Sequence, residues 1–315
     1  MKLKGVIISV CLMVILCSIP AFAAGTKLTI SYVKAPFNLQ MIVMKEQGLL
    51  EKELMPLGIT IVEWPEVISG AQQARALASG DLDIAGVINT ISVIMANSEN
   101  NPVKIIAGVA RPTDVFALVT KKDAITSIKD LKGKTVAGPK GTVLHQLLTA
   151  ALVKEGMNAK DVSLVQMDIP KAFVAMLGGN VDAALLAANT VIKATQENAR
   201  VITTAAGLVE PKLVIATSEA FAQKYPDRIK AVITAHDKAW QWITANHREA
   251  VAIGAKAQGI SVEEAEQLFA WTHFTQRLNA ADIPDMEADM RFMLENGMMR
   301  NKIDIASILL PQAME

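Results

Sequence analysis

The chain has almost no cysteine, and the position of its two cysteines excludes several classes of chemistry. Cys11 and Cys17 both lie within the first 20 residues. Two lysines and an apolar run at residues 6–19 precede the sequence Ala-Phe-Ala at 21–23, which is the pattern of a secretory leader and its cleavage site. We expect cleavage after Ala23. The exported product would then contain no thiol for nucleophilic catalysis, disulfide formation or metal binding.

Aromatic side chains and net charge are also scarce. Aromatic residues make up 4% of the chain, which argues against a pocket walled by stacked rings. The 31 basic side chains balance 31 acidic ones, and without a basic stripe nucleic acid is not an expected partner. The four histidines form no H-x-H or H-x-x-x-H pair, so we predict no metal site and no cofactor.

One segment of the sequence occurs twice. Residues 76–85 read ALASGDLDIA, and residues 175–184 read AMLGGNVDAA. Gly80 and Gly179 hold the same place in the two copies. Each copy is typical of a helix end, a glycine in the left-handed conformation and then a short buried strand. The repeat predicts two similar lobes with a ligand-binding crevice between them.

Apolar periodicity predicts strands that alternate with helices up to about residue 203, and helices alone from residue 227. This order is typical of an α/β protein and predicts mostly parallel sheets that are covered by helices on both faces. The run 212–216 resembles the earlier run 116–119, and both lie where the chain would cross between the lobes. We expect lobe 1 to comprise residues 26–112 plus 208–315, including a helical C-terminal tail, and lobe 2 to comprise residues 113–207.

The candidate ligand-binding residues lie in the loops that follow the predicted strands. In open parallel sheets these loops meet at one edge, where helix N-termini expose N–H groups that favour anions. Here the loops are rich in small hydroxyl, amide and glycine residues, so we predict a donor-rich cleft for a small polar or anionic ligand. The candidates are Phe37, Asn38, Ser69, Gly70, Asn89, Thr90, Arg111, Gly141, Thr142, His145, Asn189 and Thr190.

Several of these candidates have competing interpretations. Arg111 can bind a carboxylate or sulfonate, or it can pair with Asp114 and stiffen the crossing between the lobes. His145 lies one turn into a helix that faces the cleft and can contact a ligand. Phe37 can cover an apolar part of the ligand. The Gly141-Thr142 turn lacks the lysine of a phosphate-binding loop, so a helix start without a ligand is its alternative.

Four stretches carry a resemblance to a known family. They read LTISYVKAPFN, ALASGDLDIAGV, SIKDLKGKTVAGPKGTVLHQLL and AMLGGNVDAALL, and they cover most of residues 27–205. They resemble the periplasmic solute-binding components of ABC importers of the nitrate/sulfonate/taurine type, a group that also includes binders of thiamine precursors. The resemblance implies a two-lobed fold, the periplasmic-binding-protein fold of type II, that closes on one ligand. It also implies a periplasmic protein, which we expect to be a monomer, that presents its ligand to a permease at the inner membrane.

The sequence departs from this family after the second copy of the repeat. Many relatives carry a tryptophan or a glutamate there, often before a proline, whereas this chain has Leu-Ala-Ala-Asn-Thr at residues 186–190. An amine-bearing ligand such as taurine would lose its acidic partner at this position. We therefore predict a small anion with a modest apolar part, of the sulfonate or carboxylate type.

Two other functions can use the same architecture. A ligand-sensing module for a signalling receptor would need a fused membrane segment or a pair of DNA-reading helices, and the sequence predicts neither. The pyrimidine-synthesising relatives of the thiamine-precursor binders require a histidine donor and a cysteine-rich motif, and no cysteine follows Cys17. We therefore expect a binding protein and not an enzyme.

Overall fold

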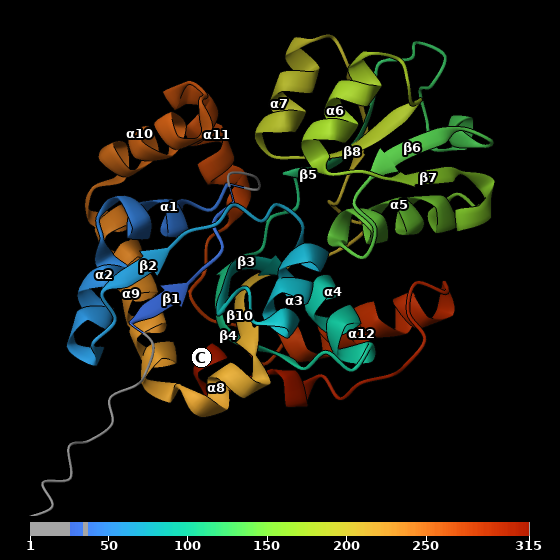
Figure 1. Cartoon of the computed structure of the whole chain (residues 1–315). Coiled ribbons are helices and arrows are strands. Elements are labelled where there is room, and N and C mark those ends of the chain that lie inside the picture. The colour runs from blue at the N-terminus through green and yellow to red at the C-terminus, as the bar shows by residue number, and fades with distance from the viewer. Residues whose placement is uncertain (1–25, 34–36, 315) are drawn as a thin grey trace, which may run out of the picture.

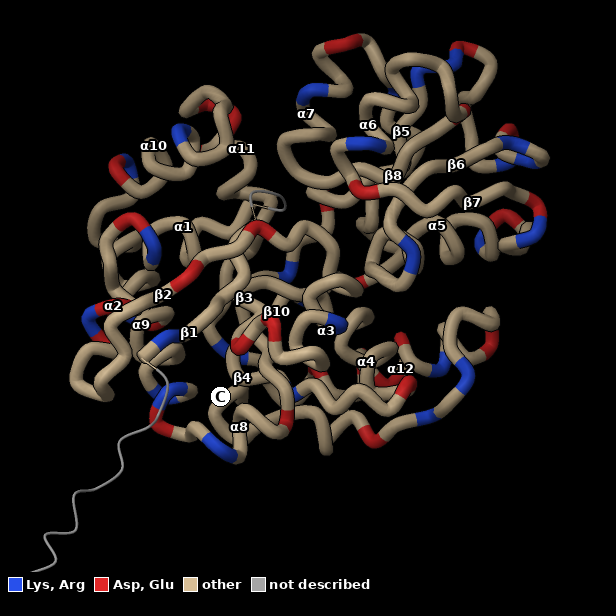
Figure 2. The backbone as a smooth tube through the Cα atoms, in the orientation of Figure 1, with Lys and Arg blue, Asp and Glu red and all other residues tan. Residues whose placement is uncertain are grey.

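We describe the fold from a computed structural model of the chain. It describes residues 26–33 and 37–314, so the predicted leader and its cleavage site lie outside the described residues. The chain forms two lobes that lie side by side, each with its own sheet structure and helices (Figure 1). Basic and acidic residues are interspersed over both lobes (Figure 2).

The first lobe contains two small sheets. Strands β1 (Lys27–Thr29) and β2 (Ile61–Glu63) pair in parallel. Strands β3 (Ile84–Asn89), β10 (Leu213–Ser218) and β4 (Val103–Ala110) form the other sheet in that order. β10 is antiparallel to both neighbours. The side chains of these three strands are almost all buried, so helices cover this sheet on both faces.

The second lobe contains one five-stranded sheet in the order β7-β6-β8-β5-β9. β6 is parallel to β7 and β8, whereas β5 is antiparallel to β8 and β9. The two central strands β8 and β5 are buried along their whole length. The strands are β5 (Phe116–Thr120), β6 (Thr135–Gly138), β7 (Ser163–Gln166), β8 (Ala183–Ala187) and β9 (Arg200–Thr204).

The α/β class is confirmed, with one correction to the strand directions. The five-stranded sheet is mixed because β5 runs antiparallel to its neighbours, and both pairings of β10 in the three-stranded sheet are antiparallel. Parallel neighbours require a crossover helix that leaves and re-enters the same sheet. β5 and β10 are the strands that follow each crossing between the lobes. The chain enters each of them from the other lobe, so no such crossover fixes their direction.

The helices cover the sheets and then continue as a C-terminal tail. Within the tail, the long helix α9 packs against α1 and α2, and α12 packs against α4, so the tail returns to the first lobe. α11 reaches α7 of the second lobe. The helices are α1 (Leu39–Glu46), α2 (Leu49–Leu54), α3 (Gly70–Ser79), α4 (Thr90–Ser98), α5 (Val143–Lys154), α6 (Ile169–Leu177), α7 (Asn189–Gln196), α8 (Glu219–Lys224), α9 (Pro226–Ala245), α10 (His247–Gln258), α11 (Val262–Thr272) and α12 (Asp282–Glu295).

The repeated segment forms the same corner in each lobe. The corner glycines both have left-handed backbone conformations, with φ of 78° and 73°. Asp83 then accepts a hydrogen bond from the N–H of Thr29 at 2.8 Å, and Asp182 accepts one from the N–H of Thr135 at 2.9 Å. Each aspartate therefore fixes the position of the strand beside its own.

The similarity of the lobes extends to the strands that follow each crossing. Thr217 of β10 donates a hydrogen bond from Oγ1 to the carbonyl oxygen of Asp83 at 2.6 Å. Thr120 of β5 makes the same bond to the carbonyl oxygen of Asp182 at 2.7 Å. The sequence resemblance between the two crossing segments thus corresponds to equivalent positions in the two lobes.

In the part of the chain that the structure describes, none of the helices combines the length and apolar character needed to cross a membrane. Within the same ranges, no three His, Cys, Asp or Glu side chains are grouped so that they could hold a metal ion.

Candidate functional site

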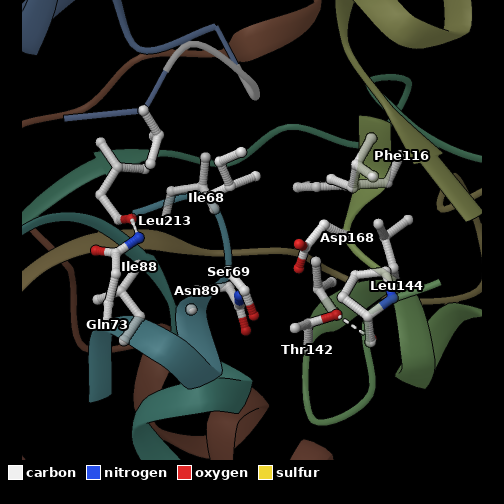
Figure 3. Close-up of a pocket in the computed structure, with 16 residues that line it drawn as sticks. Ile68, Ser69, Gln73, Ile88, Asn89, Phe116, Thr142, Leu144, Asp168 and Leu213 are labelled. Carbon is white, nitrogen blue, oxygen red and sulfur yellow. Dashed lines mark hydrogen bonds between the residues drawn. The ribbon is translucent and has the colours of Figure 1, made fainter. Parts of the chain in front are cut away.

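A pocket lies between the two lobes at the edge where α3, α4 and α5 begin. With the lobes closed, its cavity volume is about 40 Å³, so the enclosed space holds only a small group. Ser69 and Asn89 of the first lobe face Thr142 and Asp168 of the second lobe across it (Figure 3). The lining residues are Val33, Ile68, Ser69, Gly70, Gln73, Val87, Ile88, Asn89, Phe116, Pro139, Thr142, Val143, Leu144, Asp168, Ile169 and Leu213.

The lobes are in contact beside this pocket. Ser92 of α4 donates a hydrogen bond from Oγ to the carbonyl oxygen of Gly141 at 2.9 Å. Gln146 of α5 donates from Nε2 to Oδ1 of Asp289 in α12 at 2.5 Å. The structure therefore has the two lobes closed on each other at the mouth of the pocket.

Ser69 and Gly70 lie at the pocket, where α3 begins. The Ser69 side chain makes no capping hydrogen bond, so it leaves the first N–H groups of α3 uncapped. Gly70 allows a close approach of neighbouring groups. A Cβ at that position would lie 2.6 Å from Ser92 Oγ and 2.9 Å from Asn89 Nδ2.

Asn89 ends β3 and caps α4. Its Oδ1 accepts hydrogen bonds from the N–H of Ser92 at 2.9 Å and from Ser92 Oγ at 3.0 Å, so Nδ2 is the polar atom of this side chain left for a ligand. Thr90 is 1% exposed and does not line the pocket. Of the two predicted residues in this loop, only Asn89 reaches the pocket.

Thr142 lines the opposite wall at the start of α5. Its Oγ1 donates to the carbonyl oxygen of Pro139 at 2.9 Å and does not cap the helix, so the first N–H groups of α5 are also uncapped. The carbonyl group of Gly141 is used in the contact with Ser92, so this residue joins the lobes at the outer side of the pocket.

His145 supports this loop and carries no positive charge near neutral pH. Its Nδ1 accepts a hydrogen bond from the N–H of Gly141 at 3.3 Å. Burial, with a smaller contribution from the nearby Lys140, lowers the pKa of His145 to about 4. His145 does not line the pocket, and its hydrogen bond supports the Gly141 turn.

Phe37 and Asn38 do not line the pocket, and the expectation that they contact a ligand is corrected. Phe37 is fully buried, with its ring centre 6.4 Å from that of Phe274. Its ring packs so closely on Gly254 that a Cβ there would lie 2.8 Å from Phe37 Cζ. The buried Asn38 side chain donates from Nδ2 to the carbonyl oxygen of Val33. Both residues anchor the start of α1 in the core of the first lobe.

Arg111 is bound to α12 and does not line the pocket. Its Nη2 and Nε donate to the two carboxylate oxygens of Asp282 at 2.5 and 3.2 Å. Burial alone would raise the pKa of Asp282, but the hydrogen bonds from Arg111 and from the N–H of Asn279 hold it below its ordinary value. The alternative role at the lobe crossing therefore fits Arg111, with Asp282 as its partner in place of Asp114.

Asn189 and Thr190 lie at the start of α7, outside the pocket lining. Thr190 Oγ1 donates to the carbonyl oxygen of Ala187 at 2.6 Å and accepts from its N–H at 3.1 Å, which closes the turn after β8. The buried Oδ1 of Asn189 has no hydrogen-bond partner within the described ranges. A ligand contact by these two residues stays a prediction.

Asp168 is the charged residue of the pocket that the candidate set lacks. It follows β7 at the N-cap position of α6, where its side chain makes no capping hydrogen bond, and its carboxylate points across the pocket toward Ser69 and Asn89 (Figure 3). The same rule that selected the other loops would have found it, because it lies after a predicted strand and two residues before Pro170.

The sequence contains no comparable pattern from which the apolar residues of the pocket could be predicted. Ile68, Ile88, Phe116, Leu144 and Leu213 are apolar residues whose sequence context is the same as that of core residues. Only the docking of one lobe against the other turns them toward a shared space.

The pocket and the cleft outside it differ in the basic residues that line them. None of the described residues that line the pocket is a lysine, arginine or histidine. Arg75, Lys140 and Lys171 instead line the adjoining outer cleft, together with Glu99. An anionic group inside the pocket would therefore be held by backbone N–H groups of helix starts and by hydroxyl and amide groups.

Two lobes with separate open sheets, joined by paired crossings and enclosing a pocket at their helix N-termini, define the periplasmic-binding-protein fold. The alkanesulfonate-binding protein SsuA from Xanthomonas axonopodis pv. citri, solved bound to MOPS, matches this structure with a TM-score of 0.81. The match covers 91% of this chain and 98% of that protein at 21% identity.

The family model described as NMT1/THI5 like matches residues 40–250, so the chain belongs to the NMT1/THI5-like family. The chain is 32% identical over 189 residues to the taurine-binding periplasmic protein of Escherichia coli (strain K12), a match that covers 59% of this chain and spans only 58% of that relative's length. It is 28% identical over 253 residues to a putative aliphatic sulfonates-binding protein of the same strain, which covers 78% and 77% of the two chains. These matches confirm the resemblance that the four sequence stretches indicate.

Proposed function

We propose that this chain is the solute-binding component of an ABC importer and that it captures a small organic solute of the sulfonate or carboxylate type. The observation that carries the proposal is the pocket between the lobes, with the uncapped helix starts at Ser69 on one wall and at Thr142 on the other. A solute bound there contacts both lobes at once, so it stabilises the closed arrangement over an open one. The taurine- and sulfonate-binding relatives support this class of solute.

The proposed halves of the closing movement are residues 26–112 plus 208–315 and residues 113–207. A micromolar dissociation constant corresponds to only about −8 kcal/mol. A few hydrogen bonds from preset donors, together with the apolar walls, suffice for such an affinity without a catalytic group.

The proposed location is the periplasm, and the proposed partner is a membrane permease. The N-terminal leader pattern would direct the chain across the inner membrane, and the relatives are named as periplasmic proteins. The closed, loaded protein would then dock on a membrane permease and release its solute.

The test is to identify the solute. We expect mass spectrometry of the purified protein to detect a bound small acid, and isothermal titration with a panel of sulfonates and carboxylates to give at least one dissociation constant in the micromolar range. Absence of binding across the panel, or chemical turnover of the captured molecule, would contradict the proposal.

A further inference from the structure

We infer that Asp168 binds a cationic group of the ligand, and that the ligand is a compact zwitterion with its anionic end at the starts of α3 and α5. The inference rests on the proposed solute-binding function of this pocket. It adds the chemical class of the ligand and the residue that selects it.

The position of Asp168 leaves its carboxylate available to a ligand. It is the N-cap residue of α6, yet its side chain makes no capping hydrogen bond. It lines both the inner pocket and the outer cleft, and its carboxylate faces Ser69 and Asn89 across the space between the lobes (Figure 3). The side chain is therefore aimed at the place where a solute would sit.

The ion pair that the protein gives this carboxylate is weak, although Arg75 and Lys140 line the outer cleft together with it. Its ion-pair partner is Lys171, whose Nζ lies 3.9 Å from Oδ2 and whose side chain is 78% exposed. Exposed pairs of this kind are weak, because water and salt screen them. No basic side chain is among the described residues of the inner pocket, so closure brings Asp168 next to the ligand without a buried cation of its own.

A ligand with a negative charge alone fits this arrangement poorly. Its anionic group would be attracted to the helix starts at Ser69 and Thr142 but repelled by Asp168, which shares the wall of Thr142 and faces Ser69. An ammonium group on the ligand removes the repulsion and gives the carboxylate a partner as the lobes exclude water. The enclosed volume of about 40 Å³ is small, so a short spacer between the two charges fits it best.

This inference reverses part of the expectation drawn from sequence. The segment at residues 186–190 lacks an acidic side chain, which argued against an amine-bearing ligand. The structure brings an acidic side chain to the pocket from a different loop, the one between β7 and α6.

Matched ligand pairs test the inference by isothermal titration. The pairs are 2-aminoethanesulfonate with ethanesulfonate, and 3-aminopropanoate with propanoate. We expect the full-length exported protein to bind the amino member of at least one pair tenfold more tightly or better. In Asp168→Asn the amino member should lose roughly 10- to 100-fold in affinity, while the unaminated member changes little or binds more tightly.

Two further variants make the result specific. Asp123→Asn makes the same charge change at an exposed site of the same lobe and should leave both affinities unchanged. Asp168→Glu keeps the charge and should retain part of the preference. Thermal melting of each variant distinguishes a folding defect from a binding defect.

The outcomes separate this inference from the proposed function. Binding of an unaminated acid as tightly as its amino partner, or an Asp168→Asn variant that keeps the preference, would overturn the role of Asp168 and leave the binding function intact. Failure of every member of both pairs to bind would contradict both.

Discussion

Gly70 lies beside Asn89, which lines the pocket, and beside Ser92, which bonds to the second lobe. Ser92 needs its present position to reach the carbonyl group of Gly141, and Asn89 needs its position to present Nδ2 to the pocket. The packing around Gly70 leaves no room for a methyl group, so a side chain at this position would displace its neighbours.

Replacement of Gly70 by alanine should weaken ligand binding. The new Cβ would lie 2.6 Å from Ser92 Oγ, so Ser92 must move and its bond to the second lobe is lost. We expect at least a tenfold loss of affinity by isothermal titration and a stability loss of about 1–3 kcal/mol in urea unfolding. Gly178→Ala is the control, because Gly178 follows the end of α6 and does not line the pocket, so its affinity should stay at the wild-type value.

Replacement of Arg111 by alanine should affect stability more than ligand affinity. The Asp282 side chain is 5% exposed and would lose its charged partner. We expect a loss of about 1–3 kcal/mol in urea unfolding, with the ligand dissociation constant changed by less than about threefold. Arg248→Ala, at an exposed position of α10, should change neither quantity. A large loss of affinity with unchanged stability would return Arg111 to the set of ligand-binding residues.

At the scale of elements, α12 connects both lobe crossings to the second lobe. Asp282 binds Arg111 at the end of β4, and Asp285 lies 3.4 Å from Nζ of the buried Lys212 at the start of β10. One turn further, Asp289 accepts the hydrogen bond from Gln146 of α5. Three acidic residues on one helix face thus hold the two connecting strands and the closed position of the second lobe.

The Asp289 contact should make stability depend on pH. Burial raises the pKa of Asp289 to about 6; the Gln146 hydrogen bond and Lys212 lower it, and Asp285 and Glu210 raise it. The ordinary value is 3.8, so between about pH 4 and 6 the folded protein holds a proton that the unfolded chain has lost. The stability contributed by this group is present at low pH and is lost as the pH rises through 6.

Urea unfolding at pH 5 and pH 7 measures this effect. Asp289→Asn is neutral at both values, so its stability should fall less than that of the wild type between pH 5 and pH 7. Glu287→Gln removes an exposed carboxylate from the same helix and should keep the wild-type pH dependence. If Asp289→Asn also keeps it, the buried state of Asp289 is wrong.

At the scale of the whole molecule, the two lobes meet on both sides of the pocket. Besides the contacts near α5, Gln196 of α7 donates from Nε2 to Oε1 of Glu264 in α11 at 2.5 Å. A solute that bridges the lobes should therefore increase the time that these two exposed positions spend together.

Cross-linking of the pair Gln196→Cys and Glu264→Cys tests the closing movement. No cysteine occurs after residue 17, so the introduced thiols are the only ones in the described chain. With a short bifunctional thiol reagent, we expect ligand to increase the cross-linking rate several-fold. The pair Lys27→Cys and Glu63→Cys lies within the first lobe, where the native side chains are 2.9 Å apart, and should react at the same rate with and without ligand. If ligand also leaves the cross-linking rate of the Gln196→Cys and Glu264→Cys pair unchanged, ligand-driven closure is contradicted.

The sequence by itself determined the α/β class, the repeated corner and four of the pocket residues. The corner could be read because its glycine and aspartate act on adjacent backbone, and those interactions recur at the same spacing in both lobes. Ser69, Gly70, Asn89 and Thr142 could be found because helix starts after strands have local signatures.

Only the tertiary structure decided the places of Phe37, Arg111 and Asp168. Phe37 belongs to the core because α10 packs over it, and Arg111 pairs with a residue of α12 that is far away in sequence. Asp168 faces Ser69 and Asn89 across the pocket because the two lobes, which are far apart in sequence, pack against each other. Local sequence patterns fix where an element begins and ends, but the partner of a side chain depends on which distant segment packs against it.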